Sequence, residues 1–396
     1  MVTWINLLHL YQPVNTDAHV IKEATEKSYY RIIRALEEHP NIKFNINING
    51  CLFLRWEELG YMDLIKRIAK LIDQGRIELT GTACYHPVLP LIPEKEARRQ
   101  IAENEEILQK HFGKNFKPNG FFMPELAYSP EAARLVKSMG YQWIVLDEMA
   151  VDGTIGRHDF NQVYYDKNSG LKIIIRSRKI SDSYVPKTVT EILDGIKNGD
   201  ESDSKDKVVA TITDGELYGL RYIDHTAIFE KLLKRRDLQT ITISEFIEQN
   251  KKEIIAIKPQ PHSWVTGEKE YRKKEPFNLW REKGNVVQKK LWQLADLSYS
   301  TIENNQNDIN YYWARWHFVR GLASCTFWWA SAKDLWLLSP ISWNPDLIER
   351  GTNELIRSIR ALDNVATRKI KIKAEKLYIS IKKAVWKKHW AYYWKK

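Results

Sequence analysis

Two carboxylates follow apolar runs at places where active-site residues of parallel α/β proteins are commonly found. Glu125 comes after the run 120–123 and Pro124, which has no N–H for a sheet ladder. Ser129 and Pro130 then predict a helix start, which leaves Glu125 on a strand-to-helix loop. Asp214 likewise follows an apolar run, at 208–213. A facing pair of carboxylates can cleave a glycosidic bond, although either one alone could be a solvated loop residue or part of a turn.

The elements that would position this pair alternate along the first part of the chain. We expect strands at 3–8, 43–48, 76–80, 120–123, 141–146, 171–176, 208–213 and 240–243. Helical patterns occur at 24–38, 64–73, 94–112, 130–139 and 226–235. This alternation predicts an α/β fold with right-handed crossovers and a mainly parallel sheet. Seven or eight units in about 250 residues favour a barrel over an open sheet.

The texture of the sequence changes near the Pro-Gln-Pro segment at 259–261. Beyond it, the chain has helical patterns rich in Trp, Tyr and charged residues. We therefore predict a catalytic barrel at 1–257 and a mainly helical region at 258–396 packed on the barrel. A basic, aromatic-rich tail occupies 368–396.

Several segments resemble, in chain order, the regions that characterise glycoside hydrolase family 57, especially its α-amylase and amylopullulanase branch. These segments are 9–13, 75–80 with 85–91, 123–125, 176–184, 214–216, 263–267 and 327–329. Each motif is short, but their joint order is specific, and the resemblance covers roughly residues 1–335.

The resemblance implies a retaining glycoside hydrolase that acts on α-glucans such as starch, glycogen or maltooligosaccharides. It identifies Glu125 as the nucleophile and Asp214 as the general acid/base. The implied fold is an incomplete (β/α)7 barrel followed by a helical region. A retaining mechanism predicts carboxyl groups about 5–5.5 Å apart. This chemistry needs no metal and no cofactor.

Nine further residues are candidates for contacting the sugar: His9, Tyr11, Glu78, His86, Asp182, Glu216, Trp264, Trp328 and Trp329. Each has a structural alternative. His9 could be a satisfied core residue, Glu78 could hold a loop and Asp182 could cap a turn. The three tryptophans are large aromatics, which are usually well buried. We expect His86 to be functional, because a loop at the rim of a barrel is a poor place to bury a histidine.

The sequence departs from the family pattern at three positions, one of which is Ala330 in place of a glycine. Tyr11 stands where the family has a second histidine, and Cys325 stands where it has an aspartate. A tyrosine can donate a hydrogen bond and stack on a sugar, but it carries no positive charge near neutral pH. These departures alter expected substrate contacts and leave both catalytic candidates in place.

Three other functions are compatible with parts of the pattern. A 4-α-glucanotransferase or branching enzyme would use the same carboxylate pair and differ in the acceptor. A non-catalytic carbohydrate-binding protein is another possibility, against which the presence of Glu125 and Asp214 speaks. A metal-dependent deacetylase would need paired histidines, and none of the ten histidines has a second one four residues away.

Composition narrows the location and the partners. The net charge is +11, but the tail alone holds eleven Lys and Arg and a single acid. Basicity therefore does not indicate a nucleic-acid enzyme. The three cysteines lack a CxxC pair, and the first residues predict a strand rather than a signal peptide, which together suggest a cytoplasmic protein. No run is long enough for an integral membrane segment.

The tail has two interpretations. An apolar stripe at helical spacing predicts an amphipathic helix packed on the helical region. The alternative is a basic, aromatic surface for an anionic partner or a membrane face.

Overall fold

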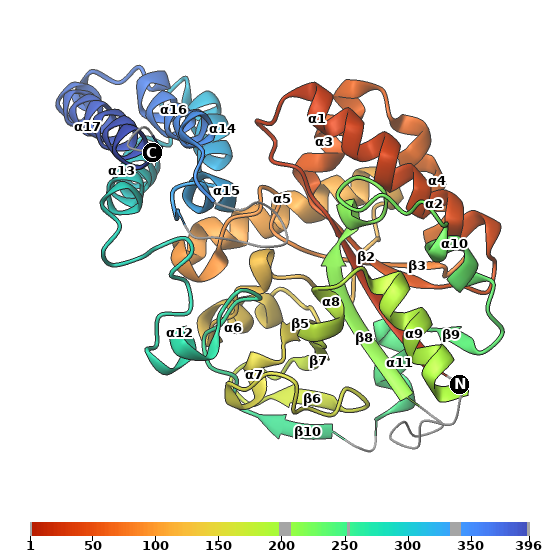
Figure 1. Cartoon of the computed structure of the whole chain (residues 1–396). Helices are drawn as coiled ribbons and strands as arrows, with labels where there is room; N and C mark the ends of the chain where they lie inside the picture. Colours follow the sequence, from red (N-terminus) through yellow and green to blue (C-terminus); the bar gives the residue numbers. More distant parts are fainter. Residues whose placement is uncertain (1, 198–206, 252–253, 333–341, 394–396) are drawn as a thin grey trace. The chain divides into compact units, whose positions relative to one another are not determined.

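The computed structural model describes residues 2–197, 207–251, 254–332 and 342–393 (Figure 1). The chain forms two compact units. Unit 1 contains residues 1–12, 16–84 and 88–276, and unit 2 contains residues 13–15, 85–87 and 277–396. Unit 1 continues beyond the boundary that the sequence suggested near 258. The reason is local pairing: the N–H of Tyr128 donates to the carbonyl of His262, and Thr266 donates to the carbonyl of Pro276.

Unit 1 contains two five-stranded sheets. The first has the order β3-β2-β1-β8, with β9 also paired to β1, and all of its pairings are parallel. The second has the order β10-β6-β7-β5-β4, and only its β6–β7 pairing is antiparallel. The first sheet comprises β1 (Val2–Leu10), β2 (Phe44–Ile48), β3 (Ile77–Thr80), β8 (Lys207–Asp214) and β9 (Leu238–Thr240). The second comprises β4 (Gly120–Phe121), β5 (Trp143–Asp147), β6 (Val163–Asp166), β7 (Lys172–Arg176) and β10 (Ile254–Ile257).

Backbone hydrogen bonds link the two sheets at two places. Just after β3, the N–H of Gly81 donates to the carbonyl of Gly120 at 2.9 Å, next to a parallel bridge between Gly81 and Phe121. Just after β7, the N–H of Ser177 donates to the carbonyl of Ala210 in β8 at 3.0 Å. The first sheet is therefore linked to the second at both ends, from β3 to β4 and from β8 to β7.

Side chains alternate along β1 between two apolar clusters. Trp4 and Leu8 belong to the cluster that includes the flanking helices. Ile5 and Leu7 belong to a second cluster, whose members come from strands of both sheets: Phe122, Trp143, Val145, Ile174, Ala210 and Ile212. Because successive strand residues point to opposite faces, His9 follows Leu7 on this second face. The inner face of β1 therefore changes from apolar to polar at the end where the strand stops.

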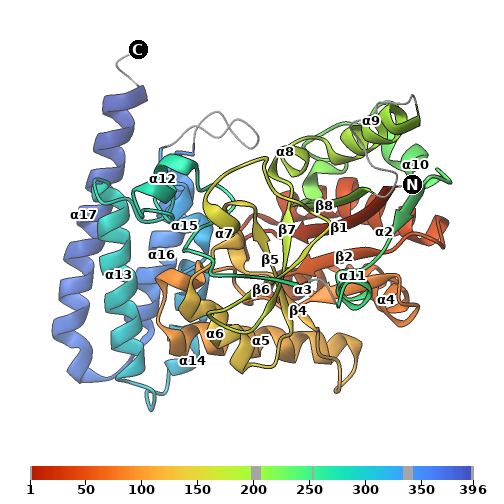
Figure 2. The ribbon, with the colours of Figure 1, turned by 90° about the horizontal axis from the view of Figure 1, so that it is seen from below.

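Helices cover the outer faces of the sheets. In Figure 2, α4 and α5 lie on one side of the strands, and α9 and α10 lie on the other. These helices are α4 (Met62–Asp73), α5 (Glu94–Phe112), α9 (Val185–Lys197) and α10 (Ile228–Leu233). The buried residues of α4 recur at the spacing of one helical face, and α5 has the bounds that the sequence predicts. The predicted α/β architecture is confirmed.

Some elements differ from the sequence prediction. The predicted strand at 240–243 is wrong beyond its first residue: β9 ends at Thr240, and α11 (Ile243–Gln249) begins at Ile243. The hydroxyl of Thr242 accepts from the N–H of Glu245, whose carboxylate accepts from the N–H of Thr242. This capping box starts a helix where the alternating Thr and Ile pattern predicts a strand.

Unit 2 is helical, as the sequence predicts for the C-terminal region. Its main helices are α13 (Val286–Glu303), α14 (Tyr311–Gly321), α15 (Ser324–Trp328), α16 (Pro345–Ala361) and α17 (Arg368–Tyr393). Helix α16 packs against α13, α14, α15 and α17, and α13 also packs against α17. Within the described part of the chain, no helix combines the length and apolarity that crossing a membrane requires.

Candidate active site

Glu125 lies a few residues after the end of β4, in the short 3-10 turn η3 (Pro124–Leu126). Its backbone is left-handed, with φ 62° and ψ 16°, and Leu126 also has a positive φ of 45°. For residues other than glycine, this conformation costs about 1–2 kcal/mol each, and such strain is concentrated at functional sites. Only 9% of Glu125 is exposed. The turn therefore holds a nearly buried carboxylate in a fixed position at the end of the strand.

Trp264 contacts Glu125 through both its side chain and its backbone. The indole Nε1 donates to Oε2 of Glu125 at 3.0 Å, and the N–H of Trp264 donates to the carbonyl of Glu125 at 3.2 Å. One carboxylate oxygen is thereby oriented by a neutral donor.

Asp214 is the last residue of β8, and its Cα is in register with that of His9 on β1. Its carboxylate is mostly buried and accepts a hydrogen bond from Nη1 of Arg221 at 2.7 Å. The guanidinium also lies close to Glu216, so it faces two acidic groups. Arg221 thus fixes the orientation of the Asp214 carboxylate.

His9 connects the surroundings of the two carboxylates. Its ring stacks on Phe122 with centroids 4.6 Å apart and meets the edge of Trp264 at 6.1 Å. Its Nδ1 lies 2.7 Å from Oδ1 of Asn47. Burial lowers the pKa of His9, which favours the neutral ring. Asp214 is therefore beside His9 in the sheet, and Glu125 is held by the tryptophan that packs on the same ring.

Tyr11 and Glu216 extend this cluster. The ring of Tyr11 stacks on that of His9 at 5.8 Å. Glu216 is buried and accepts hydrogen bonds from Nε2 of Gln12 at 2.9 Å and from the hydroxyl of Tyr29. Burial raises the pKa of Glu216, and the nearby Arg221 opposes this effect. The structure brings both predicted residues to the site.

Arg176, at the end of β7, joins a second group of charged residues to Trp264. Its guanidinium lies 5.8 Å from the centre of the Trp264 ring and donates to Asp147 at 2.8 Å and to Asp182 at 3.3 Å. Arg178 also pairs with Asp147. Burial opposes the charge of Asp147, but the two guanidinium groups outweigh it and hold its pKa below the usual range. Burial raises the pKa of Asp182.

Glu78 is not brought to this cluster. It is the second residue of β3, whereas the other residues lie at or after the carboxyl ends of strands. Its carboxylate accepts from the backbone N–H of Ser244 at 3.0 Å and from the Ser244 hydroxyl. Burial raises its pKa. These contacts correspond to the loop-holding alternative, because Glu78 anchors the first turn of α11.

Three of the predicted residues belong to unit 2. His86 is only 1% exposed, which corrects the expectation that its loop would leave it accessible. Its Nδ1 lies 3.0 Å from the hydroxyl of Ser324, and its carbonyl accepts from the Ser324 N–H, so the start of α15 encloses it. Trp328 and Trp329 are half-buried and pack edge to face, 4.3 Å apart.

Sequence reasoning did not identify Arg221, Tyr29 and Asn47. Gln12 lies within the motif at 9–13, which assigns it no role. Arg221 comes seven residues after Asp214 on an irregular segment, so only the fold reveals their contact. Asn47 could have been found, because an asparagine inside a buried strand must find a polar partner.

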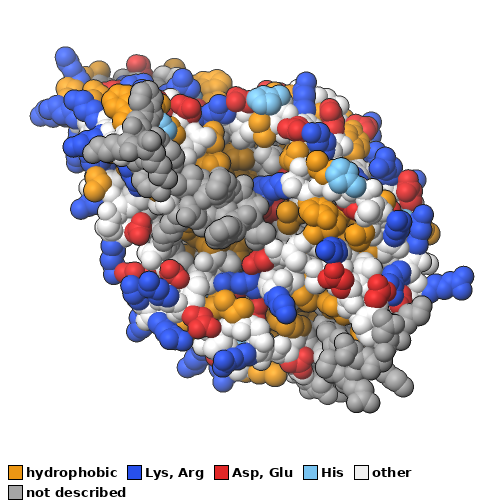
Figure 3. Space-filling view, viewed as in Figure 1, with side chains coloured by type: hydrophobic (Ala, Val, Ile, Leu, Met, Phe, Trp, Pro, Cys, Tyr) orange, Lys and Arg blue, Asp and Glu red, His pale blue; other side chains and the backbone are white. Residues whose placement is uncertain are grey.

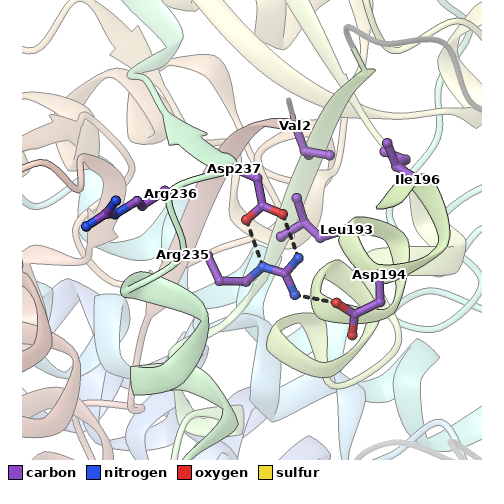
Figure 4. Close-up of a pocket in the computed structure, with 7 residues that line it drawn as sticks. All are labelled: Val2, Leu193, Asp194, Ile196, Arg235, Arg236 and Asp237. Atoms are coloured by element: carbon purple, nitrogen blue, oxygen red, sulfur yellow. Dashed lines mark hydrogen bonds and ion pairs between the residues drawn. The ribbon is translucent and has the colours of Figure 1, made fainter. Parts of the chain in front are cut away.

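A cavity in unit 1 is remote from these carboxylates. It has a volume of about 640 Å³ and lies beside the first residue of β1 and the residues that precede β9 (Figure 4). Its lining residues are Val2, Leu193, Asp194, Ile196, Arg235, Arg236 and Asp237. Arg235 pairs there with Asp194 and Asp237. Since Asp214 and His9 lie at the opposite ends of their strands, this cavity is not the candidate site.

No group of three or more His, Cys, Asp or Glu side chains is placed to hold a metal ion within the ranges that the structure describes. The cluster around His9 is thus made of carboxylates, guanidinium groups and aromatic rings.

Comparison with known proteins shows which protein family this chain resembles. The sequence model of glycosyl hydrolase family 57 matches residues 3–258. An α-amylase of Pyrococcus horikoshii is 27% identical over 234 residues, which are 58% of this chain and 36% of that enzyme. A 4-α-glucanotransferase of Thermococcus litoralis is 26% identical over 253 residues, 62% of this chain and 37% of that enzyme. The alignments thus span only about a third of these relatives.

The fold also matches that of a solved structure. A branching enzyme of Thermococcus kodakaraensis aligns with a TM-score of 0.70 at 15% identity, covering 96% of this chain and 94% of that one. The structural match includes the helical region as well as the sheets. Because the family model covers well over half of the sequence, this chain belongs to glycosyl hydrolase family 57.

Proposed function

We propose that this chain is a retaining glycoside hydrolase that acts on α-glucans, with Glu125 as the nucleophile and Asp214 as the general acid/base. The observation that carries the proposal is the position of these two carboxylates. Asp214 ends β8 in register with His9, and Glu125, on the turn after β4, accepts a hydrogen bond from Trp264, whose ring packs against that of His9. Membership of a glycosyl hydrolase family supports the proposal that glycosidic bonds are cleaved at the carboxyl ends of these strands.

The proposed reaction has two steps. A carboxylate oxygen of Glu125 attacks the anomeric carbon, the glycosidic C–O bond breaks, and Asp214 gives its proton to the departing oxygen. Asp214 then takes a proton from water, the water oxygen attacks the anomeric carbon, and the ester bond to Glu125 breaks. Each step inverts the carbon once, so the product keeps the starting configuration. Trp264 orients Glu125, and Arg221 orients Asp214.

We further infer that seven strands close into the incomplete (β/α)7 barrel expected of this chemistry. The ring would run β1, β2, β3, β4, β5, β7, β8 and return to β1. It is supported by the two hydrogen-bonded links between the sheets and by the apolar cluster that strands of both sheets share. A carboxyl separation of about 5–5.5 Å is expected in such a site.

A second candidate is glucan transfer by the same pair. The intermediate on Glu125 would then be attacked by a sugar hydroxyl instead of water. The similarity to a protein named 4-α-glucanotransferase favours this candidate as much as the similarity to an α-amylase favours hydrolysis. Tyr11, stacked on His9, would shape the acceptor side of either reaction.

Product analysis on soluble starch and on maltooligosaccharides tests the proposal. The wild type is compared with Glu125→Ala and Asp214→Ala. Asp73→Ala and Glu106→Ala are the controls, because they remove exposed carboxylates with no recorded partner among the described residues. Circular dichroism establishes that each variant is folded.

We expect the two site variants to be inactive and the controls to resemble the wild type. Shorter chains alone indicate hydrolysis, and a mixture of shorter and longer chains indicates transfer. A folded wild type that leaves every α-glucan unchanged, or full activity in either site variant, contradicts the proposal.

A further inference from the structure

Helix α17 uses one of its faces to pack within unit 2. Ala374, Ile381 and Val385 are fully buried along this face, and α17 contacts α13 and α16. The edges of the face are polar: the hydroxyl of Tyr378 donates to Asn353 at 2.7 Å, and the indole N–H of Trp386 donates to Glu349. The amphipathic packing predicted for the tail is therefore present. The opposite face of the helix is exposed.

Three large apolar side chains lie on that opposite face. Ile372, Ile379 and Trp390 are 52%, 49% and 56% exposed. They are separated by seven and eleven residues. Because an α-helix turns about 100° per residue, all three fall within about 20° of one line parallel to the helix axis. Isolated exposed apolar residues are common, but a straight ridge of three along one helix is a feature of surfaces that bind something apolar.

Lysines line one side of this ridge. Lys376, Lys383 and Lys387 are exposed, and at 100° per residue they lie about 20–60° from the ridge. Among the described residues, no acidic side chain pairs with any of them. The nearby acids are engaged elsewhere, since Glu375 pairs with Arg360 and Glu349 pairs with Lys382. The exposed face of α17 is therefore both apolar and uniformly cationic.

We propose that this exposed face of α17 binds an anionic membrane surface, with the helix lying parallel to it. The ridge of Ile372, Ile379 and Trp390 would enter the boundary between headgroups and acyl chains, and the three lysines would contact lipid phosphates and carboxylates. Figure 2 shows α17 at the outer edge of the helical unit beside α13, and Figure 3 shows Lys and Arg next to hydrophobic side chains in the part of the view where these helices lie.

The apolar ridge favours a membrane over nucleic acid as the anionic partner of this face. Lysines alone would suit any polyanion, including nucleic acid. Two isoleucines in line with a tryptophan offer nothing for a phosphate backbone to bind, and an indole is a favoured group at the interface between lipid and water. Family 57 membership does not account for this face, because the family model ends at residue 258.

Vesicle flotation with the full chain tests this inference. Vesicles of neutral phosphatidylcholine are compared with vesicles that also contain anionic phosphatidylglycerol, at ionic strengths from about 0.05 to 0.5 M. The variant Lys376→Gln/Lys383→Gln/Lys387→Gln removes the cations, and Ile372→Ser/Ile379→Ser/Trp390→Ser removes the ridge. The matched control, Lys22→Gln/Lys66→Gln/Lys70→Gln, changes the net charge equally on exposed helix positions in unit 1.

The wild type is expected to float with anionic vesicles and not with neutral ones. Each lysine near an anionic surface is worth about fivefold in partitioning, so the three-lysine variant should bind about a hundredfold more weakly. The ridge variant should bind anionic vesicles at least about tenfold more weakly than the wild type, and the control should bind like the wild type. The proposal is overturned if the wild type ignores anionic vesicles. It is also overturned if the control loses as much binding as the α17 variants, or if the chain binds only a soluble polyanion such as DNA.

Discussion

The indole Nε1 of Trp264 lies 3.0 Å from Oε2 of Glu125, and the backbone of the same tryptophan pairs with the carbonyl of the same glutamate. The contact joins residues that are 139 positions apart in the chain. It fixes one oxygen of a carboxylate whose own backbone is already held in a left-handed turn. A nucleophile needs this kind of orientation, because a displaced carboxylate loses its approach to the anomeric carbon.

Replacing Trp264 with Phe should therefore slow the reaction without unfolding the protein. A hydrogen bond to a charged group is worth about 1.5–3 kcal/mol, so kcat should fall about 10- to 100-fold. Steady-state kinetics on a maltooligosaccharide measure the effect. Trp313→Phe, at a half-exposed position of α14, is the matched control and should leave kcat unchanged. An unchanged kcat in Trp264→Phe would show that this contact does not position the nucleophile.

Arg221 should matter for activity because it orients Asp214. In Arg221→Met, we expect kcat/KM to drop by about 100-fold, in line with the loss of one group that positions a proton donor. Arg221→Lys should recover part of the loss, since a lysine can keep one contact with Asp214. Arg236→Met removes an exposed arginine at the remote cavity and is the control. Equal kinetics for the two methionine variants would count against the role of Arg221.

The buried ion pairs of Asp147 predict a large effect on stability. Asp147→Asn leaves Arg176 and Arg178 without their anion, which should cost about 3–5 kcal/mol in the free energy of unfolding. Glu94→Gln, which breaks the exposed pair with Arg98, should change it by less than about 1 kcal/mol. Urea denaturation compares the two. A change below about 1 kcal/mol in Asp147→Asn would mean that the guanidinium groups find other partners.

The same residue predicts a dependence on pH. The folded pKa of Asp147 is lowered, so its contribution to stability is present above the unfolded value of about 3.9. It is lost as the pH falls through the lower folded value. The melting temperatures of the wild type and Asp147→Asn should therefore converge as the pH falls below about 4, and a gap that stays constant well below that pH would refute the linkage.

Glu216 should show the opposite pH dependence. Its folded pKa is raised, so its favourable contribution is present below the unfolded value of about 4.3 and is lost as the pH rises through the folded value. Glu216→Gln keeps an oxygen for Tyr29 and does not ionise. The melting temperature of this variant should therefore gain on that of the wild type as the pH rises from about 4 to 7. A difference between Glu216→Gln and the wild type that stays flat across this pH range would contradict the assignment.

Regular patterns made much of the fold predictable. The strand at 3–8 and the helix at 94–112 have clear periodicity, and the structure contains both as β1 and α5. The α3 helix (Gly50–Leu59) was missed, because its buried residues form a continuous apolar run without a clear period. Strand β6 was missed because its pattern is short, and α11 was masked by a strand-like sequence whose capping box decides the outcome.

The candidate site was only partly predictable. Glu125 and Asp214 stand out because each follows a predicted strand directly. The hydrogen-bond partner of the Glu78 carboxylate could not be predicted, since Ser244 is 166 residues away in the chain. Its carboxylate accepts hydrogen bonds from the start of α11, and no local sequence pattern indicates this contact. Arg221 and Tyr29 approach their acidic partners only through the fold, and for that reason spacing alone did not find them.

Trapping the covalent intermediate tests the central claim most directly. Asp214→Ala should still accept an α-maltosyl fluoride, because fluoride leaves without a proton, and it should release the sugar slowly, because the base for the second step is missing. Mass spectrometry of the digested protein should then find a maltosyl ester on the peptide that contains Glu125, and Glu125→Gln/Asp214→Ala should show none. An ester on a different carboxylate, or turnover to a product of inverted configuration without any ester, would contradict the account.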